Sequence, residues 1–313
     1  MKSLALHSGL LALLFAAQFV LPDYHHANVA RIMIYAVLAM GYNLAYGYTG
    51  LMSLGHAMFF AAGAYGAGIA VYWGGWSAPS AFFAGVAAGC VAASAAGLLL
   101  LRVTGVAFLI VTLMLAQAGF LASIYFNAVT MGEQGMVLPP SAAIALGPFS
   151  LRLADPGFKY NAAFLAFAGV MLATLWLTRS PIGRVLIAIR ENEPRTRMLG
   201  YNTYAYRYFA ILISGSMAGM SGALYCLLFS YVGSSFASLQ YSTLPLLWTL
   251  LGGAGTVIGP FIGTAFMFYV TDIASSYTSS YLLFVGLALV AVALWLPRGI
   301  AGSLRKRWMP WLP

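Results

Sequence analysis

Charged residues are scarce in this chain. Only 7% of its 313 residues are Asp, Glu, Lys or Arg, whereas 62% are hydrophobic. An ordinary soluble domain carries about 25% charged residues. No soluble core could bury this much apolar surface, but a bilayer solvates it directly. The composition therefore excludes a soluble globular protein and indicates an all-α integral membrane protein that crosses the bilayer many times.

Acidic residues are the scarcest charged type: six Asp and Glu stand against 15 Lys and Arg, for a net charge of +9. Nearly all of the basic excess lies in a few loops and at the C-terminus, which is the distribution typical of cytoplasmic loops in membrane proteins. The positive charge therefore does not indicate nucleic-acid binding.

The chain also lacks the residue patterns that bind nucleotides and metals. Its only lysines are Lys2, Lys159 and Lys306, and no GxxxxGK[ST] motif occurs, so a P-loop for ATP phosphates is excluded. Cys90 and Cys226 both fall in apolar stretches, where cysteine is usually a small packing residue. No HExxH, CxxC or acidic cluster is present. We expect no catalytic site, no metal and no bound cofactor in this chain.

Long apolar runs account for most of the sequence. Eight of them, each about 17 to 25 residues long, are long enough to cross a bilayer as helices. They cover roughly residues 4–21, 29–46, 51–72, 79–101, 104–127, 161–178, 207–231 and 281–297. The first could be read as a signal peptide. We favour a retained span, because Pro22 and Asp23 follow it without a small-x-small cleavage site.

A ninth apolar run, 242–271, is broken by Gly252–Thr256 and Gly259-Pro260. If it crossed once, the basic C-terminal tail would lie outside the cell, whereas a run that enters and returns places the tail in the cytoplasm, as the positive-inside rule favours. Two short helices or a re-entrant hairpin both satisfy this. The sequence thus predicts about ten membrane segments in a single domain, 1–313, with both termini cytoplasmic.

The remaining loops agree with that orientation. The segment 130–160 becomes the one long external loop, and its charges, Glu133, Arg152, Asp155 and Lys159, sum to zero. Only Arg31 lies on the wrong side.

The segment 179–207 is the most polar part of the chain and holds eight of its charged side chains. Ser180-Pro181 has the form of an N-cap followed by proline at the first helical position. Glu193 precedes Pro194, which should move Glu193 out of helical geometry and start a second short helix that Gly200 ends. So short a helix is unstable alone in water, so it must dock either on its own protein's cytoplasmic face or in a partner protein.

Several motifs in order then resemble those of bacterial high-affinity branched-chain amino acid ABC permeases of the M-subunit type. The match covers about residues 30–302. Its motifs are GYTGLMSLGH at 47–56, RENE at 190–193 with Gly200, SGSMAGMSGALY at 214–225, LGGAGT at 251–256 and LPRG at 296–299.

The resemblance implies a subunit of an ABC importer with the type II, vitamin-B12-importer-like fold in a bacterial inner membrane. It implies a sister permease, two cytoplasmic ATPases that use ATP and magnesium, and a periplasmic binding protein. It places Arg190, Glu191, Asn192, Glu193 and Gly200 in the cytoplasmic coupling loop, 179–207, that contacts the ATPases.

The chain departs from the family pattern at a few positions. Leu51 replaces a frequent Gln, Leu244 replaces a frequent Glu, and 194–197 is unusually basic. These departures leave urea, short amides or another small neutral solute as alternatives to branched-chain amino acids.

Polar residues within the apolar segments are candidates for a solute pathway, because they are costly in a bilayer. Asn43, Ser53 and His56 are the candidates we select, although hydrogen bonds between helices would explain them equally well. No Asp, Glu, Lys or Arg lies in the middle of a segment, which argues against a self-sufficient ion-coupled carrier. Gly63, Ala67, Gly215 and Gly219 have the spacing of small residues at close helix contacts.

Overall fold

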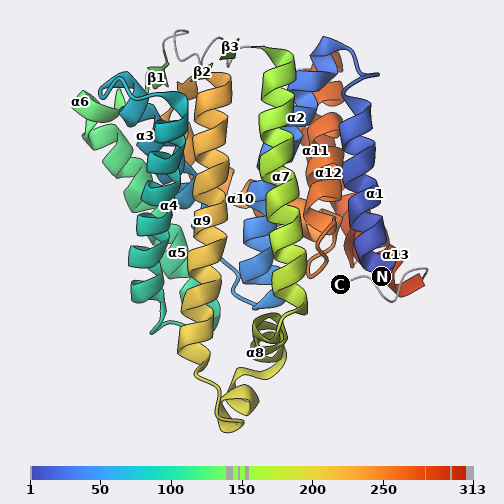
Figure 1. The fold of residues 1–313 in the computed structure, drawn as a ribbon. Helices are drawn as coiled ribbons and strands as arrows, with labels where there is room; N and C mark the ends of the chain where they lie inside the picture. The colour runs from blue at the N-terminus through green and yellow to red at the C-terminus, as the bar shows by residue number, and fades with distance from the viewer. Residues whose placement is uncertain are drawn as a thin grey trace.

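The protein is described here from a computed structural model. The structure describes residues 2–138, 144–146, 149–151, 155–278, 280–296 and 298–307. Within these residues the fold is a bundle of helices with four short strands at one end (Figure 1).

Every apolar segment expected from the sequence contains a helix, and 242–271 holds two. The helices are α1 (Lys2–Ala17), α2 (Asp23–Asn43) continued by the π-helix η1 (Leu44–Tyr48), α3 (His56–Tyr72), α4 (Ala78–Leu100), α5 (Gly105–Tyr125), α6 (Asn127–Thr130), α7 (Pro156–Arg179), α8 (Pro181–Met198), α9 (Thr203–Phe229), the 3₁₀-helix η2 (Ser234–Ala237), α10 (Leu239–Gly252), α11 (Gly259–Tyr277), α12 (Tyr281–Trp295) and α13 (Gly299–Arg307).

Five helices of the described part are long and apolar enough to cross a membrane: Tyr24–Tyr48, α4, α5, α7 and α9. α1 is apolar but shorter. The chain is thus a multi-pass membrane protein. The total of about ten crossings stays a prediction, because α10 and α12, at 14 and 15 residues, are short for a bilayer.

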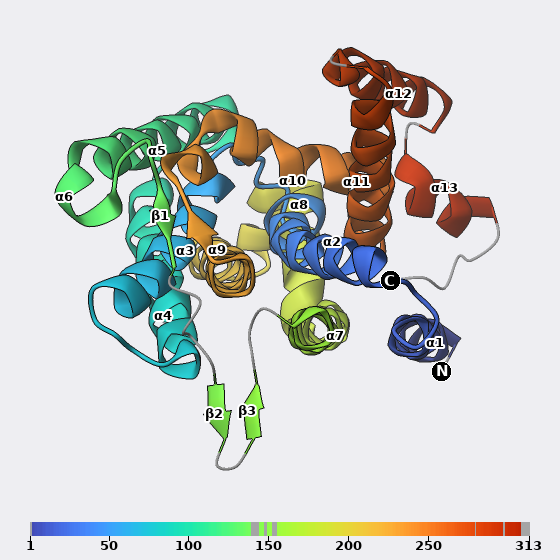
Figure 2. The same ribbon diagram turned by 90° about the horizontal axis from the view of Figure 1, so that it is seen from above.

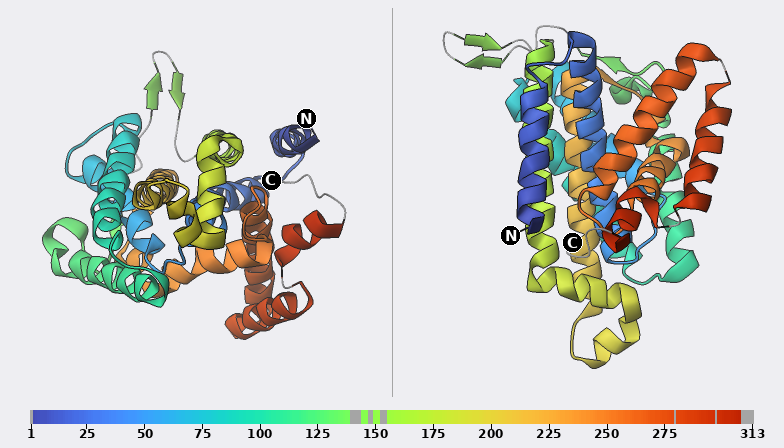
Figure 3. Two further views of the ribbon diagram at one scale, coloured as in Figure 1. Left: turned by 90° about the horizontal axis from the view of Figure 1, so that it is seen from below. Right: turned by 90° about the vertical axis from the view of Figure 1, so that its right-hand side faces the viewer.

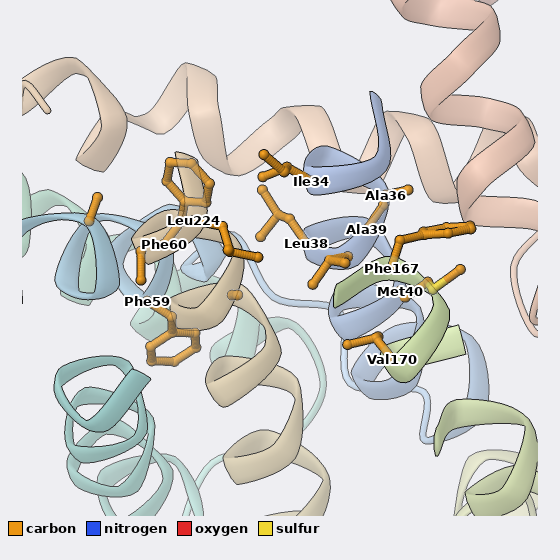
Figure 4. Packing of buried hydrophobic residues seen from close by; sticks show 14 of the residues in the cluster. Ile34, Ala36, Leu38, Ala39, Met40, Phe59, Phe60, Phe167, Val170 and Leu224 are labelled. Atoms are coloured by element: carbon orange, nitrogen blue, oxygen red, sulfur yellow. The ribbon is translucent and has the colours of Figure 1, made fainter. Parts of the chain in front are cut away.

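The centre of the bundle is formed by α2 and α9. In the most apolar stretch of α2, 83% of the residues are buried inside the protein, against 17% in α5. Figure 2 shows α2, α7 and α9 side by side and α5 at the periphery. Side chains of α2, including Ile34, Leu38 and Met40, pack between those of α7 and α9 (Figure 4). Arg207 lies near the start of α9, but Arg31 lies close to the middle of α2, which differs from the expectation that no charged residue lies in the middle of a segment.

Glycines allow α3, α4 and α9 to approach closely. A methyl group on Gly63 of α3 would overlap the carbonyl oxygen of Gly219 in α9, and one on Gly219 would lie 2.6 Å from the Cα of Gly89 in α4. A methyl group on Gly215 would collide with Ala93. The small-residue positions therefore form contacts within this chain, as the spacing predicts.

The structure corrects two boundaries. Residues 51–55, expected at the start of a helix, form a non-helical connection, and α3 begins only at His56. The segment 130–160 is also more structured than a loop. β1 (Met136–Val137) pairs antiparallel with β4 (Tyr231–Val232), β2 (Ile144–Leu146) pairs with β3 (Phe149–Leu151), and α7 already begins at Pro156. Arg152 lies outside the described residues.

The strands and α8 lie at opposite ends of the bundle (Figure 1). Two further views show α8 projecting beyond the end of α7, and α13 and the start of α1 toward that same end (Figure 3). This arrangement separates the most polar segment of the chain from the strand end.

Candidate functional site

The polar segment 179–207 starts as the sequence predicts. Ser180 is the N-cap of α8, and its hydroxyl accepts a 3.3 Å hydrogen bond from the backbone N–H of Gly183, with Pro181 in the first turn. Val185, Leu186 and Ile189 are buried. The apolar face of α8 therefore fixes the helix against the bundle and leaves its polar face outward.

The break within α8 is at Asn192, not at Glu193. Asn192 has an extended backbone (φ −161°, ψ 96°), and its side-chain oxygen accepts a 2.9 Å hydrogen bond from the N–H of Arg195. Asparagine is a strong N-cap residue and glutamate is not, so the second helix begins one residue earlier than proline alone indicates. Pro194 then occupies the first turn, where its missing N–H costs nothing.

The second helix ends at Gly200, as predicted. Gly200 has φ +89°, and its N–H donates a 3.0 Å hydrogen bond to the carbonyl of Arg197. Because a residue with a Cβ is strained at this φ, Gly200 sets the direction in which the chain leaves α8 toward α9.

The two carboxylates of this segment do different things. Glu193 lies 3.3 Å from Arg197 and 3.5 Å from Arg207, whose side chain is only 1% exposed. Glu191 is 67% exposed, and its carboxylate lies 2.7 Å from the guanidinium of Arg190. Glu193 therefore holds the segment together, whereas Glu191 lies mostly in solvent beside Arg190.

An apolar tip follows the second helix, and the sequence reading did not identify it. Met198 and Leu199 are 81% and 72% exposed, and Tyr201 and Tyr204 are also exposed. Arg197 covers the ring of Tyr204 at 4.9 Å. The sequence feature that indicates this tip is the apolar pair Met198-Leu199 next to Gly200, which ends the helix, within a charged segment. Exposed apolar clusters rimmed by charge mark interaction sites.

Arg190 joins α8 to the membrane-embedded core. Its Nη1 donates a hydrogen bond to the carbonyl of Gly47 in η1. A methyl group on Gly255 would lie 3.0 Å from the same nitrogen, so Gly255, at φ +73°, is needed for this close approach. Arg305 of α13 donates a 3.2 Å hydrogen bond to the carbonyl of Gly255.

Asn43 holds the other side of the glycine-rich turn between α10 and α11. Its Nδ2 donates to the carbonyl of Thr256 at 2.9 Å, and its Oδ1 accepts from the N–H of Gly255 at 2.8 Å. The turn is thus fixed between α2 and α8. These contacts connect α8, through Arg190 and Gly47, to the end of α2.

His56 and Ser53 lie at the start of α3. The Ser214 hydroxyl donates to the carbonyl of Gly41 at 2.6 Å, so its 2.6 Å contact with His56 requires Nε2 of the histidine to carry the proton. Ser53 accepts a 3.1 Å hydrogen bond from the N–H of Gly55. The bonds of Ser214 to His56 and to Gly41 tie the start of α3 to α9 and α2, whereas the Ser53 bond is local.

The structure does not place the three pathway candidates on one surface. Asn43, Ser53 and His56 are 0%, 4% and 2% exposed, and each is hydrogen-bonded within the bundle. Their role in a solute pathway stays a prediction, and the observed contacts are those of helix packing. Among the described residues, no three His, Cys, Asp or Glu lie together as metal ligands would.

Several apolar helices long enough to cross a membrane, with one projecting polar helix tied to their core, are consistent with an integral membrane permease. The chain belongs to the family described as branched-chain amino acid transport system / permease component, whose model matches residues 27–293. This is the family that its motifs resemble, the branched-chain amino acid ABC permeases.

Similarity to individual proteins agrees with this family assignment. The chain is 26% identical over 298 residues to the high-affinity branched-chain amino acid transport system permease protein LivM of Escherichia coli (strain K12), which covers 88% of this chain and 69% of that protein. It is 24% identical over 299 residues to LivH of the same strain, covering 86% and 91%. It is also 30% identical over 170 residues to the autoinducer 2 import system permease protein LsrC of Photorhabdus laumondii, covering 53% and 45%. No solved structure matches.

Proposed function

We propose that this chain is the membrane-spanning subunit of an ATP-driven importer that moves branched-chain amino acids delivered by a periplasmic binding protein. In this proposal it has the type II importer fold with about ten crossings, pairs with a sister permease and binds two cytoplasmic ATPases. The end that carries α8 faces the cytoplasm, together with both termini, and the strand end faces the binding protein.

The observation that carries the proposal is the construction of the α8 end. An exposed apolar tip and the exposed carboxylate of Glu191 lie at the far end of the bundle. The same helix is bonded through Arg190 to η1 and the glycine-rich turn. A surface suited to a partner protein is thus mechanically connected to the membrane core, as a subunit driven by hydrolysis elsewhere requires.

Branched-chain amino acids are the proposed solutes because the permeases LivM and LivH, which align over most of this chain, are named for them. Urea or a short amide is the alternative, because Leu51 and Leu244 depart from the family pattern. A self-sufficient carrier is less favoured, because the matching family is the permease component of a transport system.

Reconstitution tests the proposal. The whole chain should move no solute alone in liposomes, and should support leucine uptake only with the sister permease, both ATPases, ATP and the binding protein. Binding of leucine, valine, urea and acetamide to the cognate periplasmic protein identifies the solute. Uptake down a gradient by the chain alone would show a secondary carrier instead.

A point substitution tests the docking surface. Glu191→Lys should reduce co-purification of the ATPases and abolish uptake while the protein remains in the membrane. Glu133→Lys, an exposed carboxylate near the strands, is the matched control. Normal ATPase association in the Glu191→Lys variant would contradict the assignment.

A further inference from the structure

A small cavity lies between α8, η1, the glycine-rich turn and α13. Its volume is about 120 Å³, several times the roughly 15 Å³ that one water requires. It is lined by Tyr48, Thr178, Ile187, Arg190, Gly255 and Arg305. Two of these six carry a positive charge and none carries a negative one.

The polar groups around the cavity are mainly hydrogen-bond donors. Arg305 uses one Nη1 hydrogen on the carbonyl of Gly255. Arg190 bonds Gly47 and the exposed Glu191, and a guanidinium has further N–H groups beyond these. The Thr178 hydroxyl donates to the carbonyl of Leu175 at 3.2 Å. Among the described residues, the two guanidinium groups therefore have more N–H donors than the acceptors that they bond.

Tyr48 provides the independent sign of a missing ligand. Its side chain is 3% exposed, and its hydroxyl is buried with no hydrogen-bond partner among the described residues. Both guanidinium groups lie near enough to act electrostatically on this hydroxyl. A buried phenol without a partner is unfavourable, so a group that accepts its hydrogen would complete the site.

We propose that this cavity is a binding site for a phosphate group, either free phosphate or the headgroup phosphate of an anionic lipid. A tetrahedral oxyanion can accept hydrogen bonds from several directions at once, which suits Arg190, Arg305 and Tyr48 on three separate elements. Guanidinium groups form paired hydrogen bonds with phosphate, which strengthens this selectivity. A bound phosphate bridges α8 to α13 and so stiffens the connection between α8 and the glycine-rich turn.

The site is tested by the thermal unfolding of the whole purified chain in nanodiscs of phosphatidylcholine. Inorganic phosphate is titrated against sodium chloride at constant ionic strength. A ligand that binds only the folded state raises the unfolding temperature in a saturable way. Arg305→Gln should weaken the apparent phosphate affinity roughly tenfold, and Tyr48→Phe roughly threefold. Arg298→Gln, which removes a neighbouring exposed charge outside the cavity, should leave the affinity unchanged.

Nanodiscs that contain phosphatidylglycerol distinguish the two sources. If the lipid headgroup fills the cavity, added phosphate has no further effect on the wild-type chain, and Arg305→Gln removes the stabilisation by the lipid. If phosphate still acts there, the free anion is the ligand. Should Arg305→Gln fail to fold, Arg305→Lys and Tyr48→Phe carry the comparison.

Two results overturn the proposal. One is an equal phosphate response in the wild type, Arg305→Gln and Tyr48→Phe chains. The other is no response to phosphate in phosphatidylcholine together with no variant-dependent effect of phosphatidylglycerol. The measurement uses binding alone, so its failure is independent of whether the chain imports amino acids.

Discussion

The carboxylate of Glu193 lies 3.5 Å from the guanidinium of Arg207, a side chain that is almost completely buried in α9. The Nη2 of the same arginine donates a 2.5 Å hydrogen bond to the carbonyl of Val103, next to the start of α5. Arg207 thus joins the α8 segment to two membrane helices. A buried charge that loses its only ionic partner is strongly unfavourable.

Glu193→Gln should therefore destabilise the protein by about 1–3 kcal/mol, less than a fully buried pair because Glu193 is partly exposed. Thermal unfolding of the purified chain measures this. The carboxylate of Glu191 is mostly exposed beside Arg190, so Glu191→Gln should change stability by no more than about 0.5 kcal/mol. Equal effects of the two substitutions would contradict the separate roles assigned to them.

Arg190→Gln should leave the ATPases bound but uncouple their hydrolysis from transport. The reason is that the bond from α8 to Gly47 is lost while the exposed tip remains. The expected drop in leucine uptake per ATP hydrolysed is more than about tenfold, because a charged hydrogen bond of about 1.5–3 kcal/mol is removed. Arg184→Gln, an exposed arginine of the same helix, is the control. If Arg190→Gln leaves leucine uptake per ATP hydrolysed unchanged, Arg190 does not couple ATP hydrolysis to transport.

The apolar tip can be tested with a double substitution. Met198→Ser with Leu199→Ser should weaken association of the ATPases by about 1–3 kcal/mol, because exposed apolar side chains that become buried at an interface account for much of its energy. The unfolding temperature of the chain alone should hardly change. Val137 is exposed too, at 66%, but it lies in β1 at the other end of the bundle. Val137→Ser should therefore not affect association of the ATPases. If the double variant binds the ATPases as tightly as the wild type does, the ATPases dock on another surface.

The close helix contact at Gly63 can be tested by comparing two glycine-to-alanine substitutions, one at the contact and one away from it. Gly63→Ala should destabilise the bundle by about 1–3 kcal/mol, because its methyl group overlaps the backbone of α9. Gly169→Ala in α7 places a methyl group in open space and should be neutral or stabilising by up to about 1 kcal/mol. Unfolding in detergent compares the two, and a neutral Gly63→Ala would show that α3 and α9 are farther apart.

Ser214→Ala distinguishes packing from a pathway role for His56. It leaves Nε2 of the buried histidine without its acceptor, so a loss of about 1–3 kcal/mol in stability is expected. Ser216→Ala removes only a bond to the carbonyl of Leu212 within the same helix and should have a smaller effect. A changed apparent KM for solute at unchanged stability would instead support the pathway hypothesis.

The periodicity and caps of the sequence predict much of the local structure. Ser180, Pro181 and Gly200 each act where their backbone preferences require, because these preferences operate over a few neighbouring residues. The break at 252–256 is likewise local, since glycines there adopt positive φ. The break lies at Asn192 and not at Glu193, because the capping preference of asparagine decides where the second helix begins and proline only requires a position in its first turn.

Contacts between segments distant in the sequence cannot be predicted from periodicity and caps. A polar residue among apolar neighbours predicts a pathway role for Asn43, yet its hydrogen-bond partners are more than 200 residues away. Glu193 forms an ion pair with a buried arginine and Glu191 does not. This difference in their contacts depends on the position of Arg207 in α9. Neither partner is indicated by spacing, because both depend on which helices pack together.

The sequence by itself determined that the chain is a multi-pass membrane protein, which family it belongs to, and where its polar segment lies. These follow from composition, hydrophobic length and motif order, which do not depend on how helices pack. Only the tertiary structure decided that Arg190 connects this segment to the glycine-rich turn, and that Tyr48, Arg190 and Arg305 enclose a cavity. Burial and close approach of backbone are properties of the packed bundle, in which residues more than 100 positions apart become neighbours.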